Sequence, residues 1–350
     1  MIEVAALTSG RRVPSSRFRV RQYVETLRAL GVRVSEYSGW IEKYTPPPRG
    51  FPGKLWTAAK LAGRMPGLLA SAGRDVVWLE RELIAGRTTL EGFLPSSRTV
   101  LDVDDALWRT GSPGFSERIA SRCAGVIAGN EFLAEHYRRA SPRVWVVPTS
   151  IDTDRWAPSS SASTEGAGGP WTVGWMGTSG NFPYLDSIEE PLARFLETHP
   201  GTQLLVVSDR PPAFSRIAPK AWRFEPWSPD TEVAQVRRMD VGLMPLADDD
   251  WARGKCSAKM LLSMAVARPV LVSPVGSNAE ILARGAVGLG ARTPAEWLDG
   301  LHRLHQDRAF AAASGAAGRC LAVEHYSVAA NAPKLARIFG EIALRPGAGA

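Results

Sequence analysis

Residues 241–282 read VGLMPLADDDWARGKCSAKMLLSMAVARPVLVSPVGSNAEIL, and this stretch predicts two successive units of strand, loop and helix. An apolar run over 241–245 predicts a buried strand, and a helical pattern follows at 257–267. A second apolar run at 269–274 is followed by a helix at 278–284. Strands that alternate with helices in this way are typical of a parallel sheet built from βαβ units.

The same alternation covers most of the chain and is interrupted once. Residues 157–170, APSSSASTEGAGGP, are rich in Ser, Gly and Ala and show no apolar period, which is typical of a linker. We therefore predict an α/β protein with one Rossmann-like domain at 1–156 and a second at 171–326. The other expected strands are 2–7, 32–37, 75–79, 99–103, 125–128, 144–147, 171–176, 203–207, 222–224 and 287–289. The other expected helices are 16–30, 54–69, 183–196, 230–238 and 294–305, with helix through the last 40 residues.

The composition supports a two-domain globular protein. The 350 residues are 45% hydrophobic and 22% charged, which excludes collagen-like, mucin-like and wholly disordered chains. A net charge of +7 suits an anionic partner, namely a phosphate-bearing ligand, a nucleic acid or an acidic membrane surface. The basic residues are dispersed, and the chain lacks aromatic RNA-binding and zinc-finger patterns, so we do not expect a nucleic-acid partner.

Several other classes of site are not expected. The three cysteines are odd in number and far apart, which predicts no disulfide framework and fits a reducing cytoplasm. No apolar run reaches the 18 residues of a membrane-spanning helix. The five histidines are scattered, and no metal site is expected.

Four loops that follow predicted strands carry residues suited to an anionic ligand. Ligands of such folds bind at the carboxyl ends of the strands, next to helix amino termini. The helix start near Ser257 joins free backbone N–H groups to two lysines, which predicts a pyrophosphate site. The alternative is an ordinary turn with solvated arginines for the first loop, a solvated charged loop for the third and simple helix capping for the fourth. The candidate residues are Ser9 and Gly10 in the first loop, Gly177, Thr178 and Ser179 in the second, Lys255, Cys256, Ser257, Ala258 and Lys259 in the third, and Gly276, Ser277, Asn278 and Glu280 in the fourth.

The stretch 241–282, together with TVGWMGTSGNFPYL at 172–185 and VVPTSIDTDRWAP at 146–158, resembles the family 4 glycosyltransferases, which are retaining GT-B enzymes. VPSSRFRVRQYVETLRALGVRV at 13–34 and VLDVDDALW at 100–108 resemble the amino halves of a subgroup with a DxDD motif and a KCxxK motif. The resemblance covers most of the chain. It implies two Rossmann-like domains facing a central cleft and a C-terminal helix at 327–350 that returns to the first domain.

The resemblance also implies the chemistry. A UDP- or GDP-sugar would be the donor, bound at the residues of the last three loops, and no cofactor or metal would be needed. Lys259 and the helix start would offset the charge that grows on the departing nucleoside diphosphate. The leaving phosphate oxygen would take the acceptor proton, so no strong enzymatic base is required.

This sequence departs from the family at three places. The Glu-x7-Glu pair of the family falls on Gly254 and Leu262, neither of which is acidic. The Arg and Lys that the family carries in the first loop of the second domain are missing from 178–181. The active-site histidine of the family falls at Asp104, where a carboxylate would orient the acceptor rather than copy an imidazole.

The first domain is expected to bind the acceptor. Its arginines suit an anionic carboxylate or phosphate, while the acidic run suits a hydroxyl or amine. The expected acceptor residues are Ser9, Gly10, Arg17, Arg19, Asp102, Asp104 and Asp105, with Asp104 and Lys259 as the catalytic pair. The basic amphipathic helix at 54–69, with Lys54, Lys60 and Arg64 on one face, is compatible either with peripheral contact to an anionic membrane or with a solvated face.

Two other functions remain open at this point. A non-catalytic nucleotide-sugar-binding protein is favoured by the missing glutamates. A GT-B sugar-nucleotide epimerase would need acidic and basic groups around the sugar C2.

Overall fold

The computed structural model describes residues 1–159 and 169–344, which form two compact units, each built on its own parallel sheet. Unit 1 comprises Met1–Ser150, the short segment Arg253–Cys256 and the chain from Val328 onward. Unit 2 comprises Ile151–Ala252 and Ser257–Ser327. Residues 157–159 and 169–170 of the expected linker fall within the range of unit 2, and its residues 160–168 lie outside the described part of the chain.

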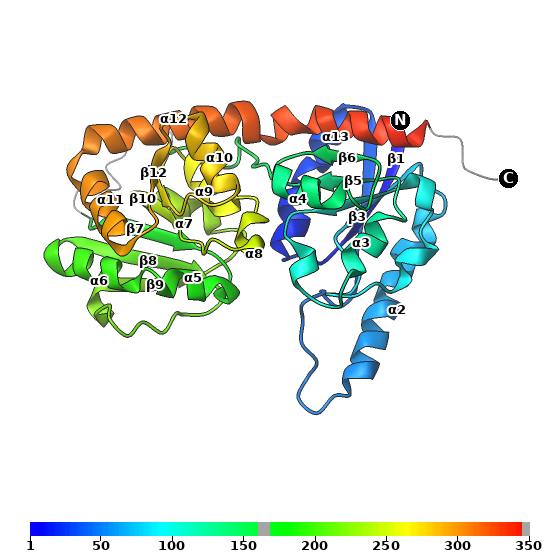
Figure 1. Cartoon of the computed structure of the whole chain (residues 1–350), viewed down its shortest axis with the longest axis horizontal. Helices are drawn as coiled ribbons and strands as arrows, with labels where there is room; N and C mark the ends of the chain where they lie inside the picture. Colours follow the sequence, from blue (N-terminus) through cyan, green and yellow to red (C-terminus); the bar gives the residue numbers. More distant parts are fainter. Residues whose placement is uncertain (160–168, 345–350) are drawn as a thin grey trace. The chain divides into compact units, whose positions relative to one another are not determined.

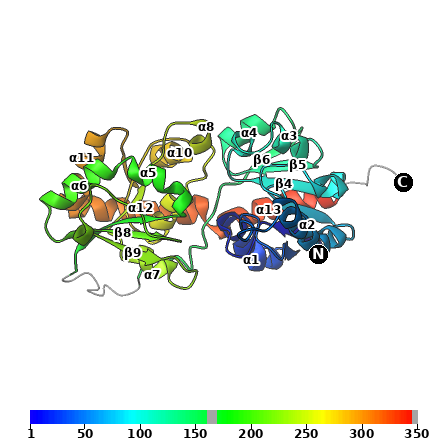
Figure 2. The same cartoon turned by 90° about the horizontal axis from the view of Figure 1, so that it is seen from below.

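The sheet of unit 1 has the strand order β2-β1-β3-β4-β5-β6, and every pair of neighbours is parallel. Helices cover both of its faces, with α1 and α13 on one side and α3 and α4 on the other (Figure 2). The strands are β1 (Ile2–Thr8), β2 (Val32–Ser38), β3 (Val76–Glu80), β4 (Thr99–Val103), β5 (Gly125–Ala128) and β6 (Val144–Val146). The α-helices are α1 (Val24–Ala29), α2 (Gly53–Ser71), α3 (Phe115–Ala120), α4 (Glu131–Tyr137) and α13 (Val328–Ala343). Short helical turns are η1 (Ser16–Val20), η2 (Arg21–Tyr23), η3 (Leu90–Phe93), η4 (Ser96–Arg98) and η5 (Leu107–Arg109).

The core of unit 1 joins the start of the chain to its C-terminal helix. Val4 and Trp78 on neighbouring strands are fully buried, and Leu335 and Phe339 of α13 pack against them. The Trp78 and Phe339 rings lie 5.1 Å apart between centroids. The helix expected at 327–350 to return to the first domain is therefore part of unit 1 over the residues that the structure describes.

The sheet of unit 2 has the order β12-β11-β10-β7-β8-β9 and is also parallel throughout. Residues from α5, α6 and α11 form one core cluster with alternate residues of the strands. The strands are β7 (Trp171–Met176), β8 (Thr202–Ser208), β9 (Trp222–Pro226), β10 (Val241–Met244), β11 (Val270–Val272) and β12 (Gly288–Gly290). The helices are α5 (Phe182–Asp186), α6 (Glu189–Thr198), α7 (Glu232–Arg237), α8 (Asp250–Arg253), α9 (Ala258–Ala265), α10 (Ser277–Arg284), α11 (Pro294–Gln306) and α12 (Arg308–Tyr326), with short turns η6 (Ser179–Asn181) and η7 (Pro219–Ala221) (Figure 1).

These sheets confirm the predicted α/β class with two Rossmann-like units, and each predicted strand lies within one or two residues of an observed one. Two helix predictions are wrong in detail. The helix expected at 183–196 is two helices, α5 and α6, because Pro191 lacks an N–H group and suits the first turn of a new helix. The helix expected at 16–30 begins as a π-helical turn, η1, followed by a 3-10 turn before α1.

Candidate functional site

In unit 2, the loops after β10 and β11 are joined by buried hydrogen bonds at the carboxyl edge of the sheet. The Ser257 hydroxyl donates to Asn278 Oδ1 at 2.6 Å, and Asn278 Nδ2 donates to the Ser273 carbonyl at 3.0 Å. Ser257 precedes α9 with a φ of 55°, and Gly276 precedes α10 with a φ of 52° and a ψ of −132°. Left-handed backbone is costly for a residue with a Cβ, so the strain at Ser257 is held by these contacts. The first turns of α9 and α10 thereby have a fixed mutual geometry.

Lys259, in the first turn of α9, lies against the loop after β7. Its Nζ is 5.6 Å from the centre of the Trp175 ring. A Cβ placed on Gly177 would stand only 2.4 Å from Lys259 Cε, so a side chain at position 177 would force the end of Lys259 to shift. The structure therefore brings together Gly177 and Lys259, which lie 82 positions apart in the sequence and were both expected to bind a diphosphate.

Other residues expected to bind the donor follow β7 or lie at the start of α10. They are Thr178 and Ser179 after β7, and Gly276, Ser277 and Glu280 at α10. Ser179 donates through its backbone N–H and its hydroxyl to the Asp209 carboxylate, at 2.6 and 2.7 Å. Burial alone would raise the pKa of Asp209, but these hydrogen bonds outweigh it and hold that pKa below its usual value. Thr178 is exposed, Ser277 is buried, and Glu280 is exposed in the first turn of α10.

The third loop divides between the two units. The segment Arg253–Cys256 belongs to unit 1, whereas Ser257, Ala258 and Lys259 belong to unit 2. Asn130, which caps α4 through its Oδ1, donates from Nδ2 to the carbonyls of Arg253 and Lys255 at 3.2 and 3.3 Å. Within unit 1, Asn130 therefore fixes this short segment through its backbone carbonyls.

The same segment contacts the acidic run that follows β4. Lys255 Nζ lies 3.8 Å from Asp105 Oδ1, and the Cys256 thiol donates to the Asp104 carbonyl at 3.3 Å. Burial raises the pKa of the Cys256 thiol, which leaves it a protonated donor rather than a nucleophile. Lys255 and Cys256 thus contact the expected acceptor residues.

Arg81, directly after β3, holds the two outer carboxylates of this run. Its Nε donates to Asp104 Oδ1 and its Nη2 to Asp105 Oδ2, both at 2.5 Å, while Nη1 donates to the Tyr44 hydroxyl at 3.2 Å. Burial would raise the pKa of Asp104, but the Arg81 charge outweighs it, so the pKa of Asp104 lies below its usual value. Asp104 is therefore an ionised hydrogen-bond acceptor at neutral pH.

The sequence prediction missed Arg81. It lies in a charged run, Glu80-Arg81-Glu82, that comes immediately after an apolar strand, and that position was the available signal. Arg81 also has a φ of 58°, one of three positive values among the described residues other than glycine. Backbone strain of this kind gathers at functional sites.

Arg19 and Asp102 form a separate, fully buried pair. Arg19 Nε donates to Asp102 Oδ1 at 2.8 Å, and Trp78 Nε1 donates to Asp102 Oδ2 at 2.9 Å. Both charged side chains are at most 2% exposed. Because these groups bind one another inside the core, they support β4, and neither is exposed to contact an acceptor as the sequence had led us to expect.

The other amino-domain candidates surround the carboxyl end of β1. The Ser9 N–H donates to Glu80 Oε2 at 2.7 Å, and the Gly10 N–H donates to the Ser16 hydroxyl at 3.3 Å. Arg17 is half-buried with its guanidinium carbon 5.2 Å from the centre of the Phe18 ring. Arg17 is therefore more exposed than Arg19.

The two positions of the missing Glu-x7-Glu pair are occupied by packing residues. Leu262 is buried in α9, and Gly254 packs on Ala106, where a Cβ would stand 2.7 Å from the Ala106 nitrogen. No side chain at either position can accept hydrogen bonds from a ribose.

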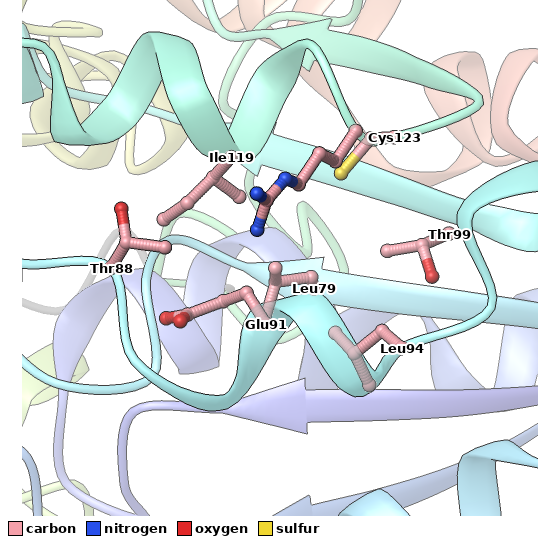
Figure 3. Close-up of a pocket in the computed structure, with 8 residues that line it drawn as sticks. Leu79, Thr88, Glu91, Leu94, Thr99, Ile119 and Cys123 are labelled. Atoms are coloured by element: carbon pink, nitrogen blue, oxygen red, sulfur yellow. The ribbon is translucent and has the colours of Figure 1, made fainter.

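One cavity of unit 1, beside Glu91 and the thiol of Cys123, has about 10 Å³ of free space, enough for about one water molecule (Figure 3). Burial, with a smaller contribution from Glu91, raises the pKa of Cys123 to about 12. Over 1–159 and 169–344, the structure has no group of three His, Cys, Asp or Glu side chains placed to hold a metal ion, and no helix with the length and apolar character to cross a bilayer.

Comparison with known proteins identifies the fold of the chain but not its family. No protein-family model and no curated protein matches the chain. Sucrose-phosphate synthase from Thermosynechococcus elongatus aligns over 98% of this chain and 99% of its own, with 15% identity and a TM-score of 0.73. WaaG, a glycosyltransferase involved in lipopolysaccharide biosynthesis, aligns over 96% and 99%, with 16% identity and a TM-score of 0.68. HepE of Anabaena, in complex with UDP and glucose, aligns over 97% and 100%, with 13% identity and a TM-score of 0.66. The chain therefore has the GT-B fold that these proteins share, with two Rossmann-like α/β units.

Proposed function

We propose that the protein is a glycosyltransferase that moves a sugar from a nucleoside-diphosphate sugar to an acceptor. The observation that carries the proposal is the meeting of Lys259, Gly177 and the amino terminus of α9 in unit 2. A lysine beside a helix amino terminus is a site for a diphosphate, because both present positive charge and N–H donors to it. The proteins of the same fold named above include one in complex with UDP and glucose, which supports this donor class.

The chemistry we propose is leaving-group stabilisation. Negative charge grows on the β-phosphate as the bond to the sugar breaks, and Lys259 and the α9 N–H groups offset it without a metal ion. The acceptor oxygen or nitrogen bonds to the anomeric carbon on the face from which the phosphate departs, and its proton passes to the leaving phosphate oxygen. The sugar is therefore transferred with retention of configuration. This route fits an ionised Asp104, which can accept a hydrogen bond but is too weak a base to drive the reaction.

We assign the acceptor to unit 1. Asp104 and Asp105, fixed by Arg81, accept hydrogen bonds from the attacking hydroxyl or amine and orient it. For an acceptor that carries a carboxylate or phosphate, we assign Arg17 as the cation that binds it. The family 4 assignment and the identity of the nucleotide, UDP or GDP, belong to the same proposal.

Calorimetric titration of UDP and GDP tests the donor site. We expect Lys259→Ala to weaken binding of the preferred nucleotide by roughly 10- to 100-fold, the value of a hydrogen bond to a charged group. Lys220→Ala is the matched control, because Lys220 is an exposed lysine of unit 2 in η7, before the amino end of β9. Equal affinity in the wild type and Lys259→Ala would refute the assignment of Lys259.

Product analysis separates transfer from the two alternatives. A transferase releases nucleoside diphosphate from donor in the presence of acceptor at a much higher rate than from donor alone. A non-catalytic binding protein releases none in either case, and an epimerase converts the donor sugar with no acceptor present.

A further inference from the structure

Helix α2 contacts the sheet of unit 1 along one side of its C-terminal half only. The residues of α2 that are buried are Gly63, Arg64, Gly67 and Ser71. A Cβ on Gly67 would stand 2.8 Å from Leu7 Cδ2 and 2.9 Å from Tyr37 Cβ, so the helix lies close against β1 and β2 there. None of the residues 53–62 is buried, and this half of the helix extends beyond the sheet of its unit (Figure 1).

The opposite side of α2 carries an exposed apolar stripe. Its members are spaced by three and four residues, which places them on one face of a helix. Leu55 is 58% exposed, Met65 43% and Leu69 71%, and two alanines complete the row. We call this row, Leu55, Ala58, Ala62, Met65 and Leu69, the outer stripe.

The loop before α2 adds exposed aromatic rings. Trp40 is 77% exposed, Tyr44 50% and Phe51 44%. The Phe51 ring meets the edge of the Trp56 ring at 5.7 Å between centroids, and Trp56 Nε1 donates to the Thr45 carbonyl at 3.1 Å. The loop is therefore tied to the first turn of α2, and its aromatic rings remain open to solvent.

Apart from Glu42, which is half-buried and accepts a hydrogen bond from the Arg12 N–H at 2.9 Å, the charges of this region are positive. Residues 43–74 contain six Lys and Arg and no Asp or Glu. Arg49 and Lys54 are exposed beside the start of the helix. The basic face expected from the sequence is different, because Arg64 is buried with hydrogen bonds to the Thr8 and Ser9 carbonyls, and Lys60 donates to the Lys43 carbonyl at 2.7 Å.

We propose that the outer stripe and the loop before it bind an anionic lipid surface. Exposed Leu and Trp with flanking Lys and Arg are the features by which a helix lies in a membrane interface, with the apolar side chains in the acyl boundary. A second copy of the chain would bring two surfaces of the same charge together, whereas anionic headgroups complement Arg49 and Lys54. This proposal does not depend on the sugar-transfer reaction.

Vesicle co-sedimentation tests it with two sets of variants of the full chain. Arg49→Gln with Lys54→Gln removes the exposed charges, and we expect binding to phosphatidylglycerol-containing vesicles to fall about 30-fold at low salt. Leu55→Ser with Leu69→Ser removes two stripe residues and is expected to lower binding roughly 100-fold. The matched controls are Arg28→Gln with Arg139→Gln and Leu30→Ser with Val323→Ser, at residues exposed elsewhere, and they should bind as the wild type does.

The outcomes are distinct. Binding of the wild type to phosphatidylglycerol vesicles but not to pure phosphatidylcholine vesicles, reduced by high salt, supports the proposal. No binding at low salt, equal binding to both vesicle types, or equal loss in the controls overturns it. A dimer in sedimentation velocity that disappears in Leu55→Ser with Leu69→Ser would instead assign the stripe to a second copy. Calorimetric UDP and GDP titrations of the same variants report unit 2 independently, so loss of lipid binding and loss of donor binding are told apart.

Discussion

Arg81 is expected to be the residue on which the acidic run of unit 1 depends most. It binds two carboxylates at 2.5 Å, and its own side chain is 9% exposed. Removing one partner of a buried ion pair costs about 3–5 kcal/mol. Lys255 remains 3.8 Å from Asp105, so we place Arg81→Ala at the lower end, near 3 kcal/mol of lost unfolding free energy.

The strained backbone at Arg81 makes a second contribution to stability, and its sign is opposite to that of the ion pairs. The φ of 58° costs roughly 1–2 kcal/mol for a residue with a Cβ, and a glycine there costs about 0.4–1 kcal/mol through the unfolded chain. Arg81→Gly should therefore be more stable than Arg81→Ala by about 0.5–1 kcal/mol, although it removes more atoms. Adding Asp104→Asn and Asp105→Asn to Arg81→Ala should restore part of the loss, because the unpaired charges are then absent.

Urea unfolding at pH 7, followed by tryptophan fluorescence, measures these differences. Arg223→Ala is the control, because Arg223 is 51% exposed in its pair with Glu225 in unit 2 and such surface pairs contribute little. A loss below about 1 kcal/mol in Arg81→Ala would refute the role of the ion pair. A glycine variant less stable than the alanine variant would refute the strain at this position.

Three further predictions follow from the same contacts. Asp104→Asn should lower kcat by about 10- to 100-fold with little change in UDP affinity, measured by steady-state kinetics and calorimetry; full turnover would show that the acidic run only supports the fold. Asn278→Ala removes the buried partner of the Ser257 hydroxyl and of the Ser273 carbonyl, so it should lower the free energy of unfolding in urea by about 1–3 kcal/mol and weaken donor binding. An unchanged affinity would show that these hydrogen bonds do not support the donor site. Burial, with nearby positive groups, lowers the pKa values of His302 and His305. The unfolded chain therefore binds protons first, and stability should fall as the pH drops below 6.5. His305→Gln should reduce this slope in urea titrations between pH 7.5 and 5.5; an unchanged slope would contradict the prediction.

Much of the fold could be predicted because its signals are local. Buried parallel strands are short apolar runs, and the runs predicted as strands lie within one or two residues of the observed strands. The stretch 16–30 was harder, since an apolar period near 3.6 does not distinguish an α-helix from a π-helical turn. The break between α5 and α6 had a local signal in Pro191, which the apolar period obscured.

The candidate site was predictable where one loop carries its chemistry. Lys259 and the start of α9 lie within a few residues of each other, and the strand-to-helix pattern identifies them. The roles of Arg81 and Asp102 were not predictable in this way, because they depend on which strands are neighbours and on where each side chain points. The pairing of Glu80 with Asp102 across β3 and β4 puts the two charged runs side by side, and only the three-dimensional structure shows that Asp102 faces Arg19 in the core while Asp104 faces Arg81.

The place of α13 in unit 1 has a consequence for the order in which the chain can fold during synthesis. Leu335 and Phe339 complete the core around Val4 and Trp78, yet they leave the ribosome after all of unit 2. Until then, the face of the first sheet that α13 covers is without that helix, and a sheet with an uncovered apolar face is prone to aggregate. Unit 2, whose last residue is Ser327, can finish first. Early release of the chain before residue 328 would thus yield a folded second unit attached to a first unit that lacks a side of its core.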